Sequence, residues 1–187
     1  TNGAGAFGAT INLNTSKIHE KAYGGFNGTI GSFGTWKTNL QFGSGLLNDK
    51  FTLDGRLSKI QSNGYIERAE SDLTSYFLSG AYVGEKSTLR LNVFSGSEVT
   101  YQAWNGVPAR LIGDDETRKF NVSGTEKSLE NPHDNEVDDY VQNHVQLLYN
   151  TQFNQNWSLS LAGHYTKGKG FFEQYKAGES FRDYGLD

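Results

Sequence analysis

Four residues in one short segment carry groups that are suited to holding a ligand. Tyr101, Trp104, Asn105 and Arg110 lie within Tyr-Gln-Ala-Trp-Asn-Gly-Val-Pro-Ala-Arg. Aromatic rings offer rigid apolar area, whereas amide and guanidinium groups direct hydrogen bonds. The Asn-Gly pair and the proline predict a compact, turn-rich element. We interpret the segment as a candidate ligand-binding surface, and a loop that packs only on itself is the alternative.

Two acidic clusters, residues 114–116 and 134–139, carry oxygen atoms of the kind that bind Ca²⁺. Neither cluster has the spacing of an EF-hand loop, so we interpret both as solvated acidic loops. His133, His144 and His164 also lack the spacing of a metal site, and the last two are expected on the polar faces of separate strands. The sequence therefore predicts neither a metal site nor a cofactor.

Catalytic and dinucleotide-binding motifs receive little support. The chain has no G-x-S-x-G elbow or other nucleophile motif, so we do not predict an enzyme. Gly3, Gly5 and Gly8 fit G-x-G-x-x-G, but that fingerprint needs a strand before it and a helix after it. Only two residues precede Gly3, and residues 9–14 alternate as a strand does. We therefore reject a dinucleotide site.

The amino-acid composition excludes several further classes of protein. The 187 residues carry a formal net charge of −4, and the lysines and arginines are scattered, so no nucleic-acid partner is predicted. Without cysteine, the chain has neither a disulfide framework nor a thiolate metal site. The mean hydropathy is −0.61 and no apolar run approaches 18 residues, which excludes a transmembrane helix. A transmembrane β-barrel stays open, because its strands alternate apolar and polar residues.

Period-2 alternation predicts an all-β chain of antiparallel up-and-down strands. The clearest runs are residues 51–58, 89–93, 144–150 and 157–165, with Leu148 as an exception. Strands are expected over about 21–32, 35–47, 50–62, 73–84, 87–97, 140–153 and 156–168. At about 10 to 14 residues they are longer than typical soluble strands and long enough to cross a bilayer.

The connections alternate between short and long. Residues 48–50, 84–86 and 154–156 are tight polar turns, whereas about 63–72, 98–139 and 169 onward are long. Membrane barrels have this asymmetry, because every second connection lies on the same side of the bilayer. The first hairpin, around Phe33 and Gly34, is a short exception.

Aromatic residues and side-chain parity extend the barrel hypothesis. Aromatic residues next to the short turns suit an interfacial girdle; these are Phe51, Tyr82, Phe153 and Trp157. Two sets of side chains are expected on opposite faces of one sheet. The polar set is Thr52, Asp54, Arg56, Arg90, Asn92, Gln146 and Ser160, and the apolar set is Leu53, Leu57, Leu89, Leu91, Leu159 and Leu161.

Residues 3–15, Gly-Ala-Gly-Ala-Phe-Gly-Ala-Thr-Ile-Asn-Leu-Asn-Thr, resemble the end of the plug domain of TonB-dependent outer-membrane receptors. In that family a last plug strand is followed by the first strand of a large barrel. The segments 101–110 and 168–175 also resemble external loops of these receptors. The resemblance implies that residues 1–16 end the plug and that residues 17–187 form the N-terminal part of the barrel. We therefore expect a fragment of a larger protein.

The resemblance also implies a function in the outer membrane. The expected receptor binds a large ligand outside the cell and imports it with energy from the TonB complex, which acts on the plug. A ferric siderophore or another iron complex is the expected ligand, ahead of haem, cobalamin and glycans. Outer-membrane lipid and the TonB complex are the expected partners.

Two alternatives from other classes stay open. A soluble carbohydrate-binding β-sandwich would use Trp36, Trp104 or Trp157 as a stacking platform, and it predicts short strands in two packed sheets. The second alternative is an outer-membrane barrel enzyme. This hypothesis predicts that an acidic residue and a histidine converge at the external rim of the barrel.

Overall fold

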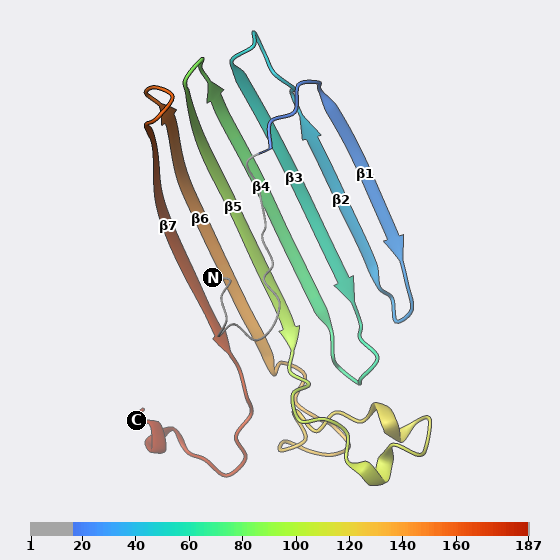
Figure 1. The fold of residues 1–187 in the computed structure, drawn as a ribbon. Coiled ribbons are helices and arrows are strands. Elements are labelled where there is room, and N and C mark those ends of the chain that lie inside the picture. The colour runs from blue at the N-terminus through green and yellow to red at the C-terminus, as the bar shows by residue number, and fades with distance from the viewer. Residues whose placement is uncertain (1–16, 187) are drawn as a thin grey trace, which may run out of the picture.

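The computed structural model describes residues 17–186 as one open antiparallel β-sheet of seven strands (Figure 1). The expected plug terminus, residues 1–16, lies outside the described residues. The strands are β1 (Tyr23–Ile30), β2 (Trp36–Gly43), β3 (Phe51–Ser62), β4 (Ser71–Val83), β5 (Ser87–Tyr101), β6 (Val137–Gln152) and β7 (Ser158–Phe172). The helices are short 3₁₀ turns, namely η1 (Ala109–Leu111), η2 (Thr117–Lys119) and η3 (Phe181–Tyr184). Each strand pairs with its neighbour in the sequence, so the order is up-and-down.

All seven predicted strands are present, with corrected ends. β1 and β2 are shorter than predicted, whereas β5 and β6 extend further toward each other, to the pair Tyr101 and Val137. Asp138 and Asp139 therefore lie in β6, and their prediction as residues of a solvated loop is wrong. Alternation alone underestimates this hairpin because its ends are fixed by contacts with other connections.

The predicted alternation of short and long connections holds for the last three connections, 84–86, 102–136 and 153–157. The connection after β2 spans residues 44–50, so it is longer than the predicted turn at 48–50 and nearly as long as 63–70. The turns after β2, β4 and β6 lie together at one end of the sheet, and the longer connections 63–70 and 102–136 lie at the other (Figure 1). The β1–β2 hairpin is short, as expected, and both Phe33 and Gly34 have positive φ, 59° and 63°. Positive φ at both central residues is typical of a type I′ turn, which matches the twist of paired strands.

The strand register confirms the predicted division of side chains between two faces. Directly paired residues share a face. Asp54, Ser79, Asn92 and Gln146 form one row across β3 to β6, which defines the polar face. The neighbouring row, Leu53, Gly80, Leu91 and Leu147, defines the apolar face. Leu148, the exception to the alternation, pairs with Arg90 and lies on the polar face.

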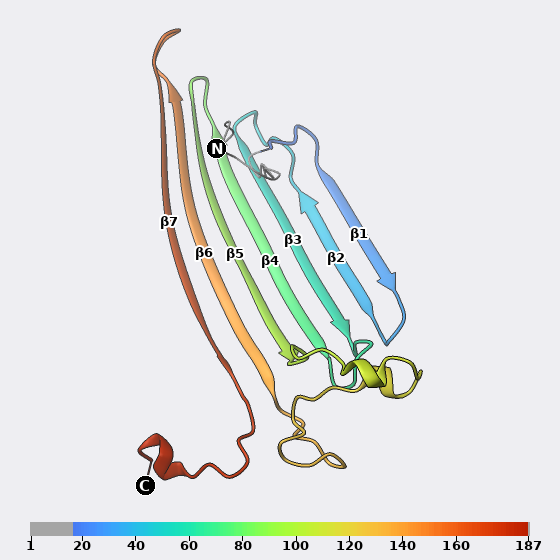
Figure 2. The same ribbon diagram turned by 60° about the horizontal axis from the view of Figure 1, so that its bottom comes forward.

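Burial is inverted relative to an ordinary globular domain. Asn92 on the polar face is 0% exposed, whereas Leu91 and Leu161 on the apolar face are 47% and 56% exposed. Within residues 17–186, the only buried members of the apolar residue types are Ala81 and Tyr101. The sheet is a single curved layer (Figure 2), and no second described layer covers its apolar face. The apolar face is therefore exposed among the described residues.

Both ends of the apolar face are marked by a change in side chains. At the short-turn end, Phe51 and Tyr82 lie with ring centroids 5.3 Å apart, and Trp157 is exposed. Toward the end with the long connections, this face carries polar residues in place of apolar ones. There the Lys59 ammonium forms an ion pair with Asp72. The apolar residues therefore form a band across the sheet, bordered by rings on one side and by charges on the other.

Aromatic rings cover glycines on adjacent strands. The Tyr140 ring lies over Gly168 and Gly170 of β7, so that a Cβ at Gly170 would meet both this ring and the Asp139 carbonyl oxygen. By contrast, a Cβ at Gly163, also in β7, would have no heavy atom within 4 Å. Gly170 allows β6 and β7 to approach each other closely, whereas Gly163 lies in open space.

We therefore expect Gly170→Val to destabilise the sheet and Gly163→Val to be nearly neutral. The new side chain at Gly170 must displace Tyr140 or β6, which costs about 1 to 3 kcal/mol. Urea denaturation of the two variants measures the difference. Equal midpoints would show that the packing of Tyr140 on β7 contributes nothing to stability.

Candidate ligand-binding surface

Tyr101, the first of the predicted ligand contacts, is buried at the end of β5. Its hydroxyl donates a hydrogen bond to the carbonyl oxygen of His133, and the carbonyl oxygen of Ser123 lies 3.5 Å from the same hydroxyl. The Arg68 guanidinium lies 5.8 Å from the centroid of its ring, within cation–π range. Tyr101 thus fixes the β5–β6 connection to the end of the sheet.

The other three predicted contacts, Trp104, Asn105 and Arg110, lie exposed in the β5–β6 connection, and Arg110 is part of η1. Trp104 is 68% exposed. Among the described residues, no hydrogen bond or ring contact joins these three to one another or to Tyr101. Their role as ligand contacts stays a prediction, with Trp104 the largest free ring of the set.

Two long connections are joined by hydrogen bonds that are at least partly buried. Arg68, in the β3–β4 connection, donates from Nη2 to the carbonyl oxygens of Asn121 and Ser123 at 2.7 and 2.9 Å. In return, the Asn121 amide donates to the carbonyl oxygens of Glu67 and Gln102, each at 3.0 Å. A guanidinium is well suited to this role, because its fixed fork of donors can serve two acceptors at once.

The segment after β7 is joined to the same group of connections. Glu173 accepts from the Asn135 amide at 2.7 Å, and its second oxygen lies 3.1 Å from His133 Nε2. These two hydrogen bonds hold the pKa of Glu173 below its usual value. Glu136 is only 2% exposed, and its carboxylate accepts from the backbone N–H of Tyr175. Glu136 is therefore structural, which corrects its prediction as part of a solvated loop.

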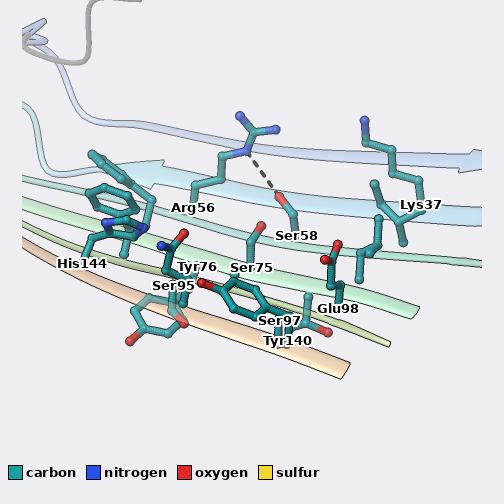
Figure 3. Close-up of a pocket in the computed structure, with 17 residues that line it drawn as sticks. Lys37, Arg56, Ser58, Ser75, Tyr76, Ser95, Ser97, Glu98, Tyr140 and His144 are labelled. Carbon is teal, nitrogen blue, oxygen red and sulfur yellow. Dashed lines mark hydrogen bonds between the residues drawn. The ribbon is translucent and has the colours of Figure 1, made fainter. Parts of the chain in front are cut away.

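A hollow of about 960 Å³ lies on the polar face, in the half of the sheet next to the long connections (Figure 3). Its floor includes Ser58, Ser75 and Gly96, which are direct partners on β3, β4 and β5. Small side chains at three adjacent positions leave the space above the sheet open. A Cβ at Gly96 would have no heavy atom within 4 Å.

A row of rings borders this hollow. Phe77, Phe94 and His144 are direct partners on β4, β5 and β6. The ring centroids of Phe77 and Phe94 are 6.0 Å apart, and those of Phe94 and His144 are 4.5 Å apart with an interplanar angle of 12°. Because this spacing is close to the separation of paired strands, the stacked rings stand upright on the sheet. Their edges, rather than their faces, point toward the space above it.

Charged groups stand around the same hollow. Arg56 is the direct partner of Phe77, and its Nε donates to Ser58 Oγ at 3.3 Å. Lys37 and Glu98 line the hollow as well. Figure 3 shows that Arg56 and Lys37 extend away from the sheet on the same side. Among residues 17–186, no ion pair is recorded for any of these three groups.

Sequence reasoning placed His144 on the polar face but missed the hollow. Phe77 and Phe94 hold positions where the alternation calls for polar residues, and this break in parity was the available signal. Their proximity to Arg56 follows from the register of three strands, which single-strand patterns do not give. Within the described residues, no cluster of three or more acidic, histidine or cysteine side chains is arranged to hold a metal ion.

No family model matches the chain, and no curated protein or solved structure is significantly similar to it. In the part of the chain that the structure describes, no helix combines the length and apolar character needed to span a bilayer. The candidate surface therefore rests on the geometry of the polar face and of the long connections.

Replacing Arg68 should loosen the long connections without disturbing the sheet. In Arg68→Gln, the carbonyl oxygens of Asn121 and Ser123 lose a charged donor, at a cost of about 1.5 to 3 kcal/mol. We expect amide hydrogen exchange at residues 121–125 to accelerate more than tenfold, with exchange in β4 and β5 unchanged. The control is Arg110→Gln, which removes an exposed arginine from the β5–β6 connection, where residues 121–125 also lie. Similar exchange in both variants would contradict the role assigned to Arg68.

Proposed function

We propose that this chain is the N-terminal barrel portion of a TonB-dependent outer-membrane receptor, with its apolar face in lipid and its polar face toward the lumen. The observation that carries the proposal is the inverted burial. Asn92 is fully buried while its neighbour Leu91 is exposed. A lipid environment accounts for a continuous apolar face, which is costly to expose to water.

Further support comes from the two edges of the sheet. In the described residues, β1 and β7 each pair on one side only. Unpaired strand edges do not occur in the hydrocarbon region, so a membrane sheet must close into a barrel. Receptors of this family have about 22 strands. In the proposal, the strands that complete the barrel come from the rest of a larger protein.

The band of apolar residues sets the proposed orientation. Along β7 it runs from Trp157, just before the strand begins, to Tyr165. This length is close to the 9 to 11 residues with which a tilted strand crosses a bilayer. The rings at the short turns then lie at the periplasmic interface, and the long connections lie outside the cell. The resemblance of residues 3–15 to a plug terminus supports uptake of an iron complex with energy from the TonB complex.

The sandwich alternative fits the structure less well. It predicts short strands in two packed sheets, whereas the described residues form long strands in one sheet. Its three tryptophans are also dispersed. Trp36 lies in β2, Trp104 in the β5–β6 connection, and Trp157 beside the β6–β7 turn. They do not form a common platform for a sugar.

The enzyme alternative predicted an acid and a histidine at the external rim, and His133 and Glu173 are such a pair, 3.1 Å apart. However, both residues also join the connections to each other, and the His133 ring packs near Tyr175. Among the described residues, no serine or threonine hydroxyl is recorded in contact with the His133 ring. A structural role explains the pair fully, so we retain the receptor as the proposed function.

A charge scan of adjacent residues on β7 tests the membrane assignment. Leu161 lies on the apolar face and Ser160 on the polar face, and both are exposed. Leu161→Arg should impair insertion of the full receptor into the outer membrane, because a charge in the middle of the lipid face costs about 2 to 4 kcal/mol. Ser160→Arg should insert normally. Equal amounts of both variants in outer-membrane fractions would rule out the assignment.

The role of Trp104 in ligand capture has a separate test. If Trp104 anchors the ligand, Trp104→Ala should weaken binding of the imported iron complex by about 1 to 3 kcal/mol. The control is Leu129→Ala, which removes another exposed apolar side chain from the same connection. Affinities are measured on purified full receptor. Undiminished affinity in Trp104→Ala would show that this residue is not a ligand contact.

A further inference from the structure

We propose that the hollow on the polar face is a binding subsite for an anionic oxygen group of a small ligand, such as a carboxylate. The proposed function supplies the route by which the ligand reaches this subsite. The chemistry of the subsite itself follows from three features of its wall: the upright rings, the two cations and the hydroxyl floor.

The ring row contributes positive potential. An aromatic ring carries partial negative charge on its faces and partial positive charge at its edge. Phe94 and His144 are stacked on each other, so their inner faces are covered and their edges point into the hollow. At this end of the row, His144 Nδ1 also lies 2.9 Å from Thr166 Oγ1 on β7, which holds the imidazole in place.

The two cations are placed to receive an anion. The Asn39 amide oxygen, in the orientation that its hydrogen-bonding neighbours favour, accepts from Arg56 Nε at 2.6 Å and from Arg56 Nη2 at 3.3 Å. Each terminal nitrogen of a guanidinium carries two hydrogens, so Nη1 and the second hydrogen of Nη2 can still form a forked contact with a carboxylate. Lys37 extends from β2 on the same side of the sheet (Figure 3). Glu98 is the one carboxylate among the lining residues, so the cations exceed the anions.

A neutral sugar fits these features less well. Sugars pack against open ring faces, whereas the described row presents edges. The floor hydroxyl of Ser75 can donate to an anionic oxygen beside the guanidinium, whereas the Ser58 hydroxyl lies 2.7 Å from the Asn39 amide. An anionic group is therefore the ligand chemistry that the rings, the cations and the floor have in common.

The electrostatic potential in the hollow can be measured through the reactivity of a single cysteine placed there. The chain has no cysteine, so Ser75→Cys places one reporter in the floor, in full receptor freed of any other cysteine. Its modification rate is measured with two methanethiosulfonates, one carrying a sulfonate and the other a trimethylammonium group. We expect the sulfonate reagent to be favoured, and Arg56→Gln to lower the rate ratio about fivefold, as loss of one nearby unit charge implies.

The matched control is Arg182→Gln, which removes an arginine of η3 that does not line the hollow. It should leave the ratio unchanged. The proposal is overturned if the trimethylammonium reagent is favoured, or if Arg56→Gln changes the ratio no more than the control does.

Binding itself is tested by protection of the same cysteine. Benzene-1,3,5-tricarboxylate should slow modification by the sulfonate reagent, whereas its neutral trimethyl ester should not. Gly96→Leu, which fills the open space above the floor, should abolish protection, and Gly163→Leu on the apolar face should preserve it. Lack of protection by the tricarboxylate would overturn the proposal.

These measurements are separable from the test of the receptor assignment. Reagent ratios and protection report on the hollow in any folded form of the protein, whether or not it imports an iron complex. Outer-membrane insertion of Leu161→Arg and Ser160→Arg reports on the lipid face alone. Failure of one test leaves the other conclusion standing.

Discussion

The register of the antiparallel backbone ladder is the constraint on which the other features depend. Because successive side chains point to opposite faces, a shift of one residue between two strands would exchange the polar and apolar faces. Six successive strand pairs keep a common parity, from Tyr23 paired with Gly43 to Gln152 paired with Ser158. One face can therefore be continuously apolar although the chain as a whole is hydrophilic, with a mean hydropathy of −0.61.

The same register builds the candidate site. It places Arg56, Phe77, Phe94 and His144 in one row and the small residues of the floor in the next. The long connections are then fixed at one end of the sheet by a few polar groups, chiefly Arg68, Asn121 and Tyr101. The strands thus supply rigid positions for the candidate ligand contacts, while the connections supply exposed aromatic and charged groups at the end of the sheet.

The sequence was sufficient to predict the seven strands and the two faces, because period-2 alternation is a local signal that each strand carries by itself. It was not sufficient for features that depend on contacts between strands or loops. The extension of β5 to Tyr101 depends on His133, and the burial of Glu136 depends on the segment after β7. For the same reason the pairing of Phe77 with Phe94 could not be predicted from the patterns of the single strands.

The central claim is that the apolar face lies in lipid, and a nitroxide scan along β7 tests it most directly. Labels are placed one at a time at residues 158–166 of the full protein in bilayers, and their collisions with oxygen and with a water-soluble nickel chelate are measured. The account predicts a period-2 pattern, in which labels at 159, 161 and 165 meet oxygen and labels at 158, 160 and 164 meet the chelate. Equal access of the chelate to both sets, or a reversed pattern, would contradict the account.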